Sequence, residues 1–153
     1  MEEREHEHCK KRTEVQKCGL ASHSRTVGAP RVLAVFAVRR CGLTQGADLV
    51  KKGKTDSLKG LCKTLFSKPA QLVFEMKIVE STDEKLSIDF HYRPLVKAWQ
   101  NAGCTDEEIA KLCDIAMCGD HGIGECYGSV LDLPKCIAKG DDICALRYHK
   151  MES

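Results

Sequence analysis

The hydrophobic pattern of residues 31–66 predicts two helices. An apolar run, RVLAVFAVR, follows Pro30, and on periodicity alone it fits a buried strand as well as a buried helix. We predict a helix, because Pro30 suits a first helical position and continuation through residue 52 gives a helix-like length. A second helix should follow Asp56, where apolar residues recur at helical spacing: Leu58, Leu61, Cys62, Leu65 and Phe66.

The next segment alternates in the way that half-buried strands do. Pro69 ends the second helix, and apolar and polar residues then alternate over residues 72–79 and again over residues 86–93. The polar cluster at residues 81–84 favours a turn, so we predict an antiparallel hairpin. The residues expected on one face of its second strand are Leu86, Ile88, Phe90 and Tyr92.

The last third of the chain begins with a well-marked helix. Thr105 and Glu108 have the spacing of a capping box, in which the two side chains satisfy each other's backbone amides. We expect this helix to end near Gly119, because the glycine-rich residues 119–128 predict a loop. A final strand is predicted over residues 143–149. Together these elements indicate an α+β fold, a small antiparallel sheet packed against several helices.

Chain length and composition favour a single globular domain. A length of 153 residues suits one domain, and 42% hydrophobic with 30% charged residues is typical of neither a disordered chain nor a membrane span. Residues 1–29 are polar and have no sustained period. We therefore predict a poorly ordered arm over residues 1–29 and one α+β domain over residues 30–153.

Charge and motifs narrow the expected partners and location. A formal net charge of +2 and 5% aromatic residues argue against nucleic-acid binding, and no apolar run predicts a membrane partner. The first residues lack an apolar signal core, which favours a cytoplasmic location with reduced thiols. Without a dinucleotide or phosphate-loop motif, no cofactor is expected. The expected partner is a small-molecule substrate, and a homo-oligomer is compatible with the sequence.

Ten cysteines and six histidines raise the question of a metal site. Zinc and iron–sulfur sites need several ligands on short spacings, whereas this chain has no Cys-x-x-Cys pair. We therefore predict no metal site. The tract His6-Glu7-His8-Cys9 could bind a divalent ion weakly, although an incidental charged stretch is the commoner explanation.

Two groups of polar residues are candidates for ligand binding. His91 and Arg93 fall on the polar face of a predicted strand, next to Pro94. That position suits an anion or carboxylate site, and it is equally typical of a solvated face. Asp114 and Asp120 flank the predicted helix end, where a carboxylate could act as a general base for water or simply stabilise a loop.

Two cysteines are candidate nucleophiles. Cys113 lies on the apolar stripe of its predicted helix, where a cysteine usually behaves as a small inert hydrophobe. Cys113 or Cys144 could react if a neighbouring His or Arg lowers the pKa of the thiol, because the thiolate is the reactive form. The residues alone leave both interpretations open.

Three segments, in this order, resemble the L-2-amino-thiazoline-4-carboxylic acid hydrolase family. They are FHYRPLV at residues 90–96, LCDIA at residues 112–116 and GDDICALRY at residues 140–148. Family members have a Cys-Pro pair, a Leu-Cys followed by an Asp, and a Gly-x-x-x-Cys. The resemblance covers about residues 32–149, and this chain departs from it at Arg93, where the family has cysteine.

The resemblance implies a hydrolytic ring opening. Water adds to C2 of a cyclic amidine and the C–S bond opens, giving N-carbamoyl-cysteine. The reaction needs a base or a thiol nucleophile, a donor for the tetrahedral centre and a cation for the substrate carboxylate. The residues implied are Cys113 as nucleophile or site-lining thiol with Cys144, Asp120 as base and His91 as acid/base partner for catalysis, and Arg93 as carboxylate anchor with Asp114 for substrate binding.

Arg93 keeps two other functions under consideration. If the family cysteine is essential, this chain acts on a different substrate or has lost the activity. The main alternative is a non-catalytic small-molecule-binding or sensor module with a cysteine-lined cavity. A third is a metal- or redox-responsive protein.

Overall fold

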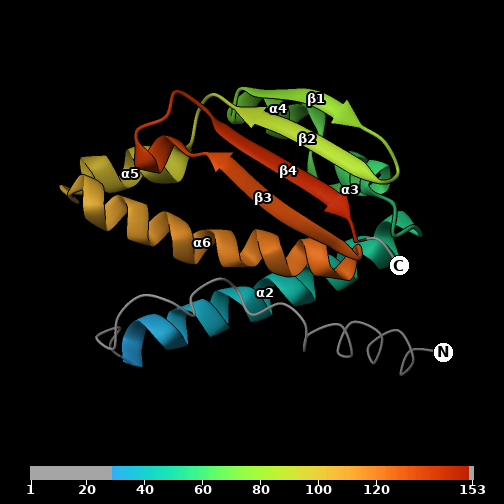
Figure 1. Cartoon of the computed structure of the whole chain (residues 1–153), viewed down its shortest axis with the longest axis horizontal. Helices are drawn as coiled ribbons and strands as arrows, with labels where there is room; N and C mark the ends of the chain where they lie inside the picture. Colours follow the sequence, from blue (N-terminus) through green and yellow to red (C-terminus); the bar gives the residue numbers. More distant parts are fainter. Residues whose placement is uncertain (1–28, 152–153) are drawn as a thin grey trace.

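A computed structural model describes residues 29–151 and shows one sheet with helices against it (Figure 1). The α+β class is confirmed, with five α-helices and a four-stranded antiparallel sheet in these residues. The predicted arm lies outside the described residues apart from residue 29. The elements are α2 (Ala29–Gly53), α3 (Leu58–Leu65), α4 (Lys68–Val73), β1 (Met76–Ser81), β2 (Lys85–Phe90), α5 (Pro94–Asn101), α6 (Asp106–Cys126), β3 (Ser129–Lys135), the 3-10 helix η2 (Ile137–Lys139) and β4 (Cys144–Lys150).

The last strand of the chain lies inside the sheet. The strand order is β1-β2-β4-β3, and every neighbouring pair is antiparallel. The predicted hairpin of β1 and β2 is confirmed. On β4, Cys144 pairs with Phe90 and Tyr148 pairs with Leu86, so the buried faces of the two strands are continuous. This pairing brings the start of β4 next to the end of β2.

One face of the sheet supplies the core and the other is polar. Leu86, Ile88 and Leu146 are buried together with the helix residues Leu58 and Leu61. Burying such side chains contributes about 1.5–3 kcal/mol each. The alternate positions of the strands carry charged groups, for example Arg147 and Asp89, whose side chains lie 2.6 Å apart.

The two long helices, α2 and α6, lie side by side (Figure 1). The predicted loop at residues 119–128 is wrong, because α6 continues to Cys126. Gly122 allows α6 to pack closely against α2. A Cβ atom on Gly122 would lie 2.7 Å from the carbonyl oxygen of Arg39, so only glycine admits this approach. Arg39 also pairs with Glu125 at 2.5 Å across the two helices.

The predicted strand over residues 72–79 is too long at its start. Leu72 and Val73 belong to α4, and Leu72 is 81% exposed. Pro69 lies in the first turn of this helix, where proline is well tolerated. Glu75 then adopts a positive φ of 47°, which turns the chain into β1. The alternation was therefore part of an exposed helix followed by a strand.

The second hairpin strand also ends earlier than predicted, at Phe90. Tyr92 is exposed and does not share the buried face of β2. Pro94 begins α5, so the chain leaves the sheet before residue 93.

The last third contains a confirmed boundary and a missed strand. The capping box is present: the backbone amide of Glu108 donates to Thr105 Oγ1 at 3.3 Å, and that of Thr105 donates to Glu108 Oε2 at 2.8 Å. Strand β3 was not predicted. It is an edge strand whose register shifts between Asp132 and Lys135, around Pro134, so it lacks regular alternation.

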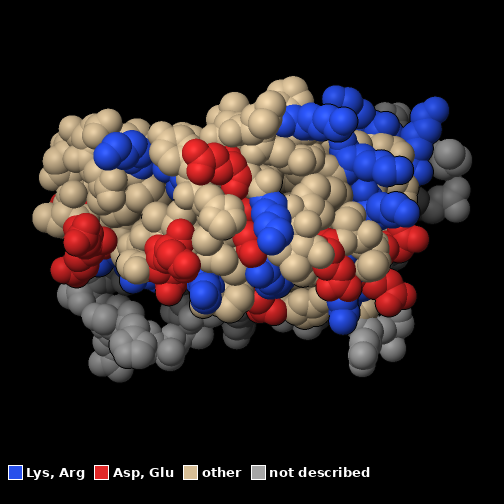
Figure 2. Space-filling model, turned by 90° about the horizontal axis from the view of Figure 1, so that it is seen from above, with Lys and Arg blue, Asp and Glu red and all other residues tan. Residues whose placement is uncertain are grey.

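The surface carries both charges. Figure 2 shows basic side chains gathered towards the right of the face seen from above, with acidic groups along its lower edge. None of the helices formed by residues 29–151 is long and apolar enough to cross a membrane.

Candidate active site

Three cysteines from three different elements meet in the core; we call Cys113, Cys136 and Cys144 the thiol cluster. Cys113 lies on α6, Cys136 precedes η2 and Cys144 begins β4. The Sγ atoms of Cys113 and Cys136 are 3.6 Å apart. The exposed fractions are 2% for Cys113, 2% for Cys136 and 0% for Cys144. The cluster is therefore a tertiary feature held inside the protein.

The turn between β3 and β4 positions two of the three thiols. The backbone amide of Cys136 donates to Asp141 Oδ2 at 2.7 Å, and that of Ile137 donates to Cys144 Sγ at 3.2 Å. Gly140 has a φ of 97°, a conformation that favours glycine, and it ends η2. This turn returns the chain so that Cys144 enters the sheet beside Cys136.

Hydrogen bonds among the three thiols favour the ionised form of Cys136 over the ionised forms of Cys113 and Cys144. Thiol donation from Cys113, and then from Cys144, lowers the pKa of Cys136, and the nearby Lys139 acts in the same direction. The same hydrogen bonds raise the pKa of Cys113 and the pKa of Cys144, with burial adding to both. The cluster is therefore suited to hold a single thiolate with two thiol donors.

Arg93 places a positive charge beside the thiols. Its guanidinium carbon lies 5.3 Å from the centre of the Phe90 ring, and Nη2 lies 3.9 Å from Met117 Sδ. The charge of Arg93 acts to lower the pKa of Cys113 and of Cys144, against the larger effects of the neighbouring thiol and burial. No carboxylate of residues 29–151 forms an ion pair with Arg93, so its charge is available to an anion.

Asp120 follows Cys113 by two helical turns on the same face of α6. Burial raises the pKa of the Asp120 carboxyl to about 6, with Arg93 opposing that shift. Tyr148 is buried, and its hydroxyl donates to the backbone carbonyl of Asp120 at 3.3 Å. A carboxyl that titrates near neutral pH can accept and return a proton, as a general base must.

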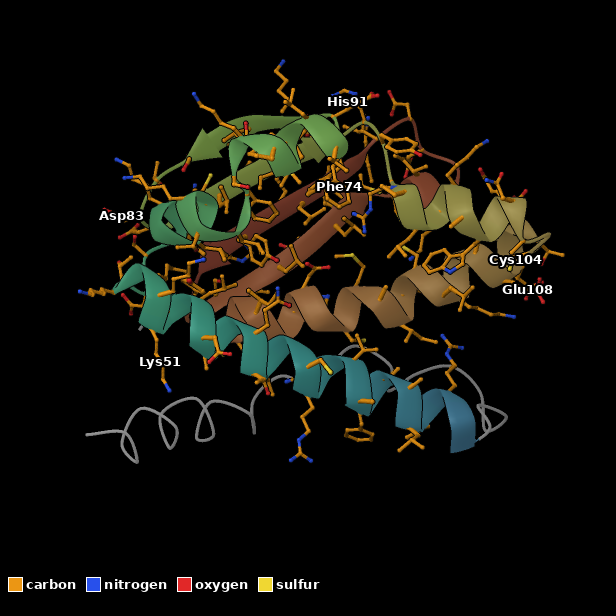
Figure 3. The ribbon with its side chains drawn as sticks, turned by 180° about the vertical axis from the view of Figure 1, so that it is seen from behind. Lys51, Phe74, Asp83, His91, Cys104 and Glu108 are labelled. Carbon is orange, nitrogen blue, oxygen red and sulfur yellow. The ribbon has the colours of Figure 1, made fainter. Side chains whose placement is uncertain are left out.

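The structure brings together four of the six residues proposed from the sequence: Arg93, Cys113, Asp120 and Cys144. His91 is exposed, and its backbone amide donates to the carbonyl oxygen of Glu75 at 3.2 Å. Figure 3 labels His91 at the edge of the molecule opposite α6. Asp114 is 49% exposed and pairs with Lys139 at 2.8 Å. These two residues lie outside the cluster.

Two members of the site were not proposed from the sequence. Cys136 fell between the predicted glycine-rich loop and the predicted final strand, and Tyr148 appeared only as part of that strand. A usable signal was the eight-residue separation of Cys136 and Cys144 across Gly140, because a tight turn at a glycine returns the chain on itself.

Two further features bear on the site. A shallow groove of about 680 Å³ runs along α2, and its lining residues include Arg40, Thr44 and Asp48. None of the thiol cluster lines this groove. Within the part of the chain that the structure describes, no group of three or more His, Cys, Asp or Glu side chains is arranged to hold a metal ion.

Comparisons with known proteins find a family that matches the sequence and a solved structure with a similar fold. Residues 33–148 match the family described as L-2-amino-thiazoline-4-carboxylic acid hydrolase. No curated protein sequence matches the chain. A crystal structure of trafficking protein particle complex subunit 3 from Naegleria fowleri, covalently bound to palmitic acid, is similar with a TM-score of 0.53 and 13% identity, covering 99% of this chain and 98% of that chain. At this identity, the similarity shows a shared fold alone.

Proposed function

The chain belongs to the L-2-amino-thiazoline-4-carboxylic acid hydrolase family, and on that premise we propose that it opens the ring of a cyclic amidine by adding water. The substrate is L-2-amino-thiazoline-4-carboxylate or a related thiazoline that bears a carboxylate. One observation carries the proposal: Arg93, which has no ion-pair partner among the described residues, acts electrostatically both on the thiol cluster and on Asp120, a carboxyl whose pKa is raised to about 6.

Substrate binding is assigned to Arg93. Guanidinium groups bind carboxylates through two parallel hydrogen bonds, which fix the orientation of a small substrate. The Phe90 ring and Met117 hold the guanidinium within reach of the cluster. A substrate carboxylate on Arg93 would thus place the ring near the thiols.

The first chemical step is assigned to Cys136. Its thiolate adds to C2 of the ring, and the C2–S bond then breaks, so the ring sulfur leaves as a thiol after taking a proton. Cys113 or Cys144 supplies that proton, since both stand as thiol donors to Cys136. This moves the nucleophile from Cys113, as first expected, to the neighbouring thiol.

The second step is assigned to Asp120 and water. The carboxylate takes a proton from water, which adds to the carbon bound to Cys136. Asp120 returns that proton to the nitrogen of the former ring, and the hydroxyl proton goes back to the thiol that protonated the ring sulfur. Collapse of the centre then expels the Cys136 thiolate and leaves a urea, which is N-carbamoyl-cysteine for the thiazoline substrate. Arg93 stands where the family has a cysteine, and Cys136 still gives the cluster three thiols.

A non-catalytic small-molecule-binding module is the second candidate function. The arginine at the position of a family cysteine favours it, because losing one reactive thiol can end catalysis and leave a binding site. Such a module would bind the thiazoline without consuming it, and binding to the native state would raise the melting temperature.

The experiment follows the substrate by mass spectrometry with purified, reduced protein. Formation of N-carbamoyl-cysteine, abolished in Cys136→Ala and strongly reduced in Cys113→Ala, is the expected result. Cys41→Ala is the matched control, because Cys41 is exposed on α2, and it should keep full turnover. An unchanged substrate would reject the hydrolase, and a rise in melting temperature without turnover would then select the binding module.

A further inference from the structure

Cys136 is as buried as its two neighbours, but it lies at the start of a turn that reaches the surface within three residues. Cys113 lies within a helix of 21 residues, and Cys144 is already paired in the sheet. Cys136 instead begins a short turn in which Lys139, Gly140, Asp141 and Asp142 are all exposed. Short segments with few buried contacts open locally at lower free energy than core helices or central strands. Cys136 is therefore the thiol that a small reagent should reach first.

A second thiol lies within contact distance of Cys136. The Sγ atoms of Cys136 and Cys113 are 3.6 Å apart, and a disulfide would require an approach of about 1.5 Å. The turn that carries Cys136 can supply this movement, whereas Cys113 is fixed by α6. The positive charges of Lys139 and Arg93 both lie near the cluster and favour its thiolate form.

From this geometry we propose that Cys136 is a site of oxidative modification by small hydroperoxides, with Cys113 as its resolving thiol. The Cys136 sulfur attacks the hydroperoxide and breaks the O–O bond, giving a sulfenic acid and an alcohol, or water when the oxidant is hydrogen peroxide. The Cys113 thiol then displaces the hydroxyl group, forming the Cys113–Cys136 disulfide and water. A small thiol reductant reverses the bond.

This modification extends beyond the proposed hydrolase and does not depend on it. The disulfide is detected in the protein itself, whatever the protein does to a substrate. Where the proposed function also holds, oxidation stops turnover because it consumes the attacking thiolate. A negative result in one experiment leaves the other intact.

Peptide mapping after treatment with hydrogen peroxide tests the proposal in the full chain. Trypsin places Cys136 in residues 136–139, Cys113 in residues 112–135 and Cys144 in residues 140–147. The expected product is residues 136–139 linked to residues 112–135, and it should vanish on treatment with dithiothreitol. The link should also be lost in Cys113→Ser, which separates Cys113 from Cys118 and Cys126 on the same peptide.

One further variant and a second readout guard against a folding artefact. Cys41→Ser should form the link as fully as the wild type, with an unchanged melting temperature. In Cys113→Ser, oxidised Cys136 should react with dimedone, which traps sulfenic acids. Oxidation of Cys41 or Cys104 while residues 136–139 remain reduced and unlinked would overturn the proposal.

Discussion

Arg93 shows how one side chain defines the character of the site. It occupies the N-cap position of α5, makes no side-chain capping bond there, and instead brings its guanidinium over Phe90 beside Met117. The residues around it offer polarisable surface but no carboxylate partner within residues 29–151. A half-buried cation in such surroundings attracts an anion more strongly than an exposed one does. Its neighbour Asp120 adds a group that titrates near neutral pH.

Replacing Arg93 by methionine should weaken substrate binding while keeping the packing against Phe90. Loss of a charge-assisted bond to a carboxylate costs about 2–3 kcal/mol, so KM should rise by roughly 30- to 160-fold. Steady-state kinetics with the thiazoline substrate measures this change. Arg40→Met, at an exposed position on α2, is the control, and an unchanged KM in Arg93→Met would remove the anchor role.

Asp120 should make stability depend on pH in a defined direction. Burial raises its pKa to about 6 in the folded protein, so the folded state retains a proton that the unfolded chain releases at lower pH. The contribution of Asp120 to the free energy of unfolding is therefore fully present below about pH 4 and is lost as the pH rises through 6. Asp120→Asn should match the wild type at pH 4 and exceed its stability by about 1–3 kcal/mol at pH 7.

Urea unfolding at the two pH values measures this difference for Asp120→Asn. Asp142→Asn is the control, because that side chain is 82% exposed, and it should show no pH-dependent gain. Equal effects of the two substitutions would mean that burial does not raise the pKa of Asp120. Under the proposed function, the more stable Asp120 variant should also lose turnover, as expected for a strained catalytic group.

The two helices α2 and α6 pack closely where glycines lie between them. Gly42 faces the backbone of Gly119, and a Cβ atom on Gly42 would overlap the Gly119 carbonyl group. A Cβ atom on Gly119 would instead meet Val38 Cγ1 at an ordinary 3.4 Å. Two glycines in one interface thus have different roles, and only the first is required by contact.

Gly42→Ala should therefore destabilise the protein, while Gly119→Ala should not. Overpacking against a helix backbone costs about 1–3 kcal/mol, so the melting temperature of Gly42→Ala should fall clearly. Gly119→Ala gains up to about 1 kcal/mol of helix propensity without a clash. Thermal unfolding of the two variants gives the comparison, and a similar loss in both would contradict the packing described here.

An ion pair at the surface joins the short element η2 to α6. Lys139 Nζ lies 2.8 Å from Asp114 Oδ1, and this contact secures the turn that covers Cys136. Asp114→Ala should let the turn open more often and so increase the rate at which iodoacetamide labels Cys136, by about two- to fivefold for an exposed pair worth up to about 1 kcal/mol. Glu107→Ala, which breaks the exposed pair with Lys111, should leave that rate unchanged.

At the scale of the whole molecule, the strand order assembles the site. Because β4 lies between β2 and β3, Cys144 comes beside the end of β2, from which the chain leads to Arg93. Helix α6 crosses the same region with Cys113 and Asp120. Residues more than fifty positions apart thus share one buried volume without any local motif.

The domain described here should fold without the residues before it. Among residues 29–151, the buried core runs from Leu58 to Tyr148, and α2 packs against α6 and α3. A chain beginning at Ala29 should therefore melt within a few degrees of the full chain, since one or two kcal/mol shifts a domain of this size by only that much. Circular dichroism on heating measures it, and an unfolded product would assign a structural role to the preceding residues.

Much of the fold follows from local rules that act within a few residues. The capping box at Thr105, the proline near the start of α2 and the periodic stripe of α3 each specify an element through contacts along the chain. The β1–β2 hairpin likewise follows from alternation around a polar turn. The resemblance to the hydrolase family also came from short motifs in the sequence, and the family match confirms it.

Other features depended on contacts between distant segments. Glycines at residues 119–128 suggest a loop when read alone, but Gly119 and Gly122 lie on the face of α6 that packs against α2, because packing outweighs local propensity. Strand β3 exists through its pairing with β4 despite Pro134. The proximity of Cys136 to Cys113 comes from the tertiary positions of the turn and of α6. Sequence separation does not encode this distance, on which the chemistry of the thiols depends.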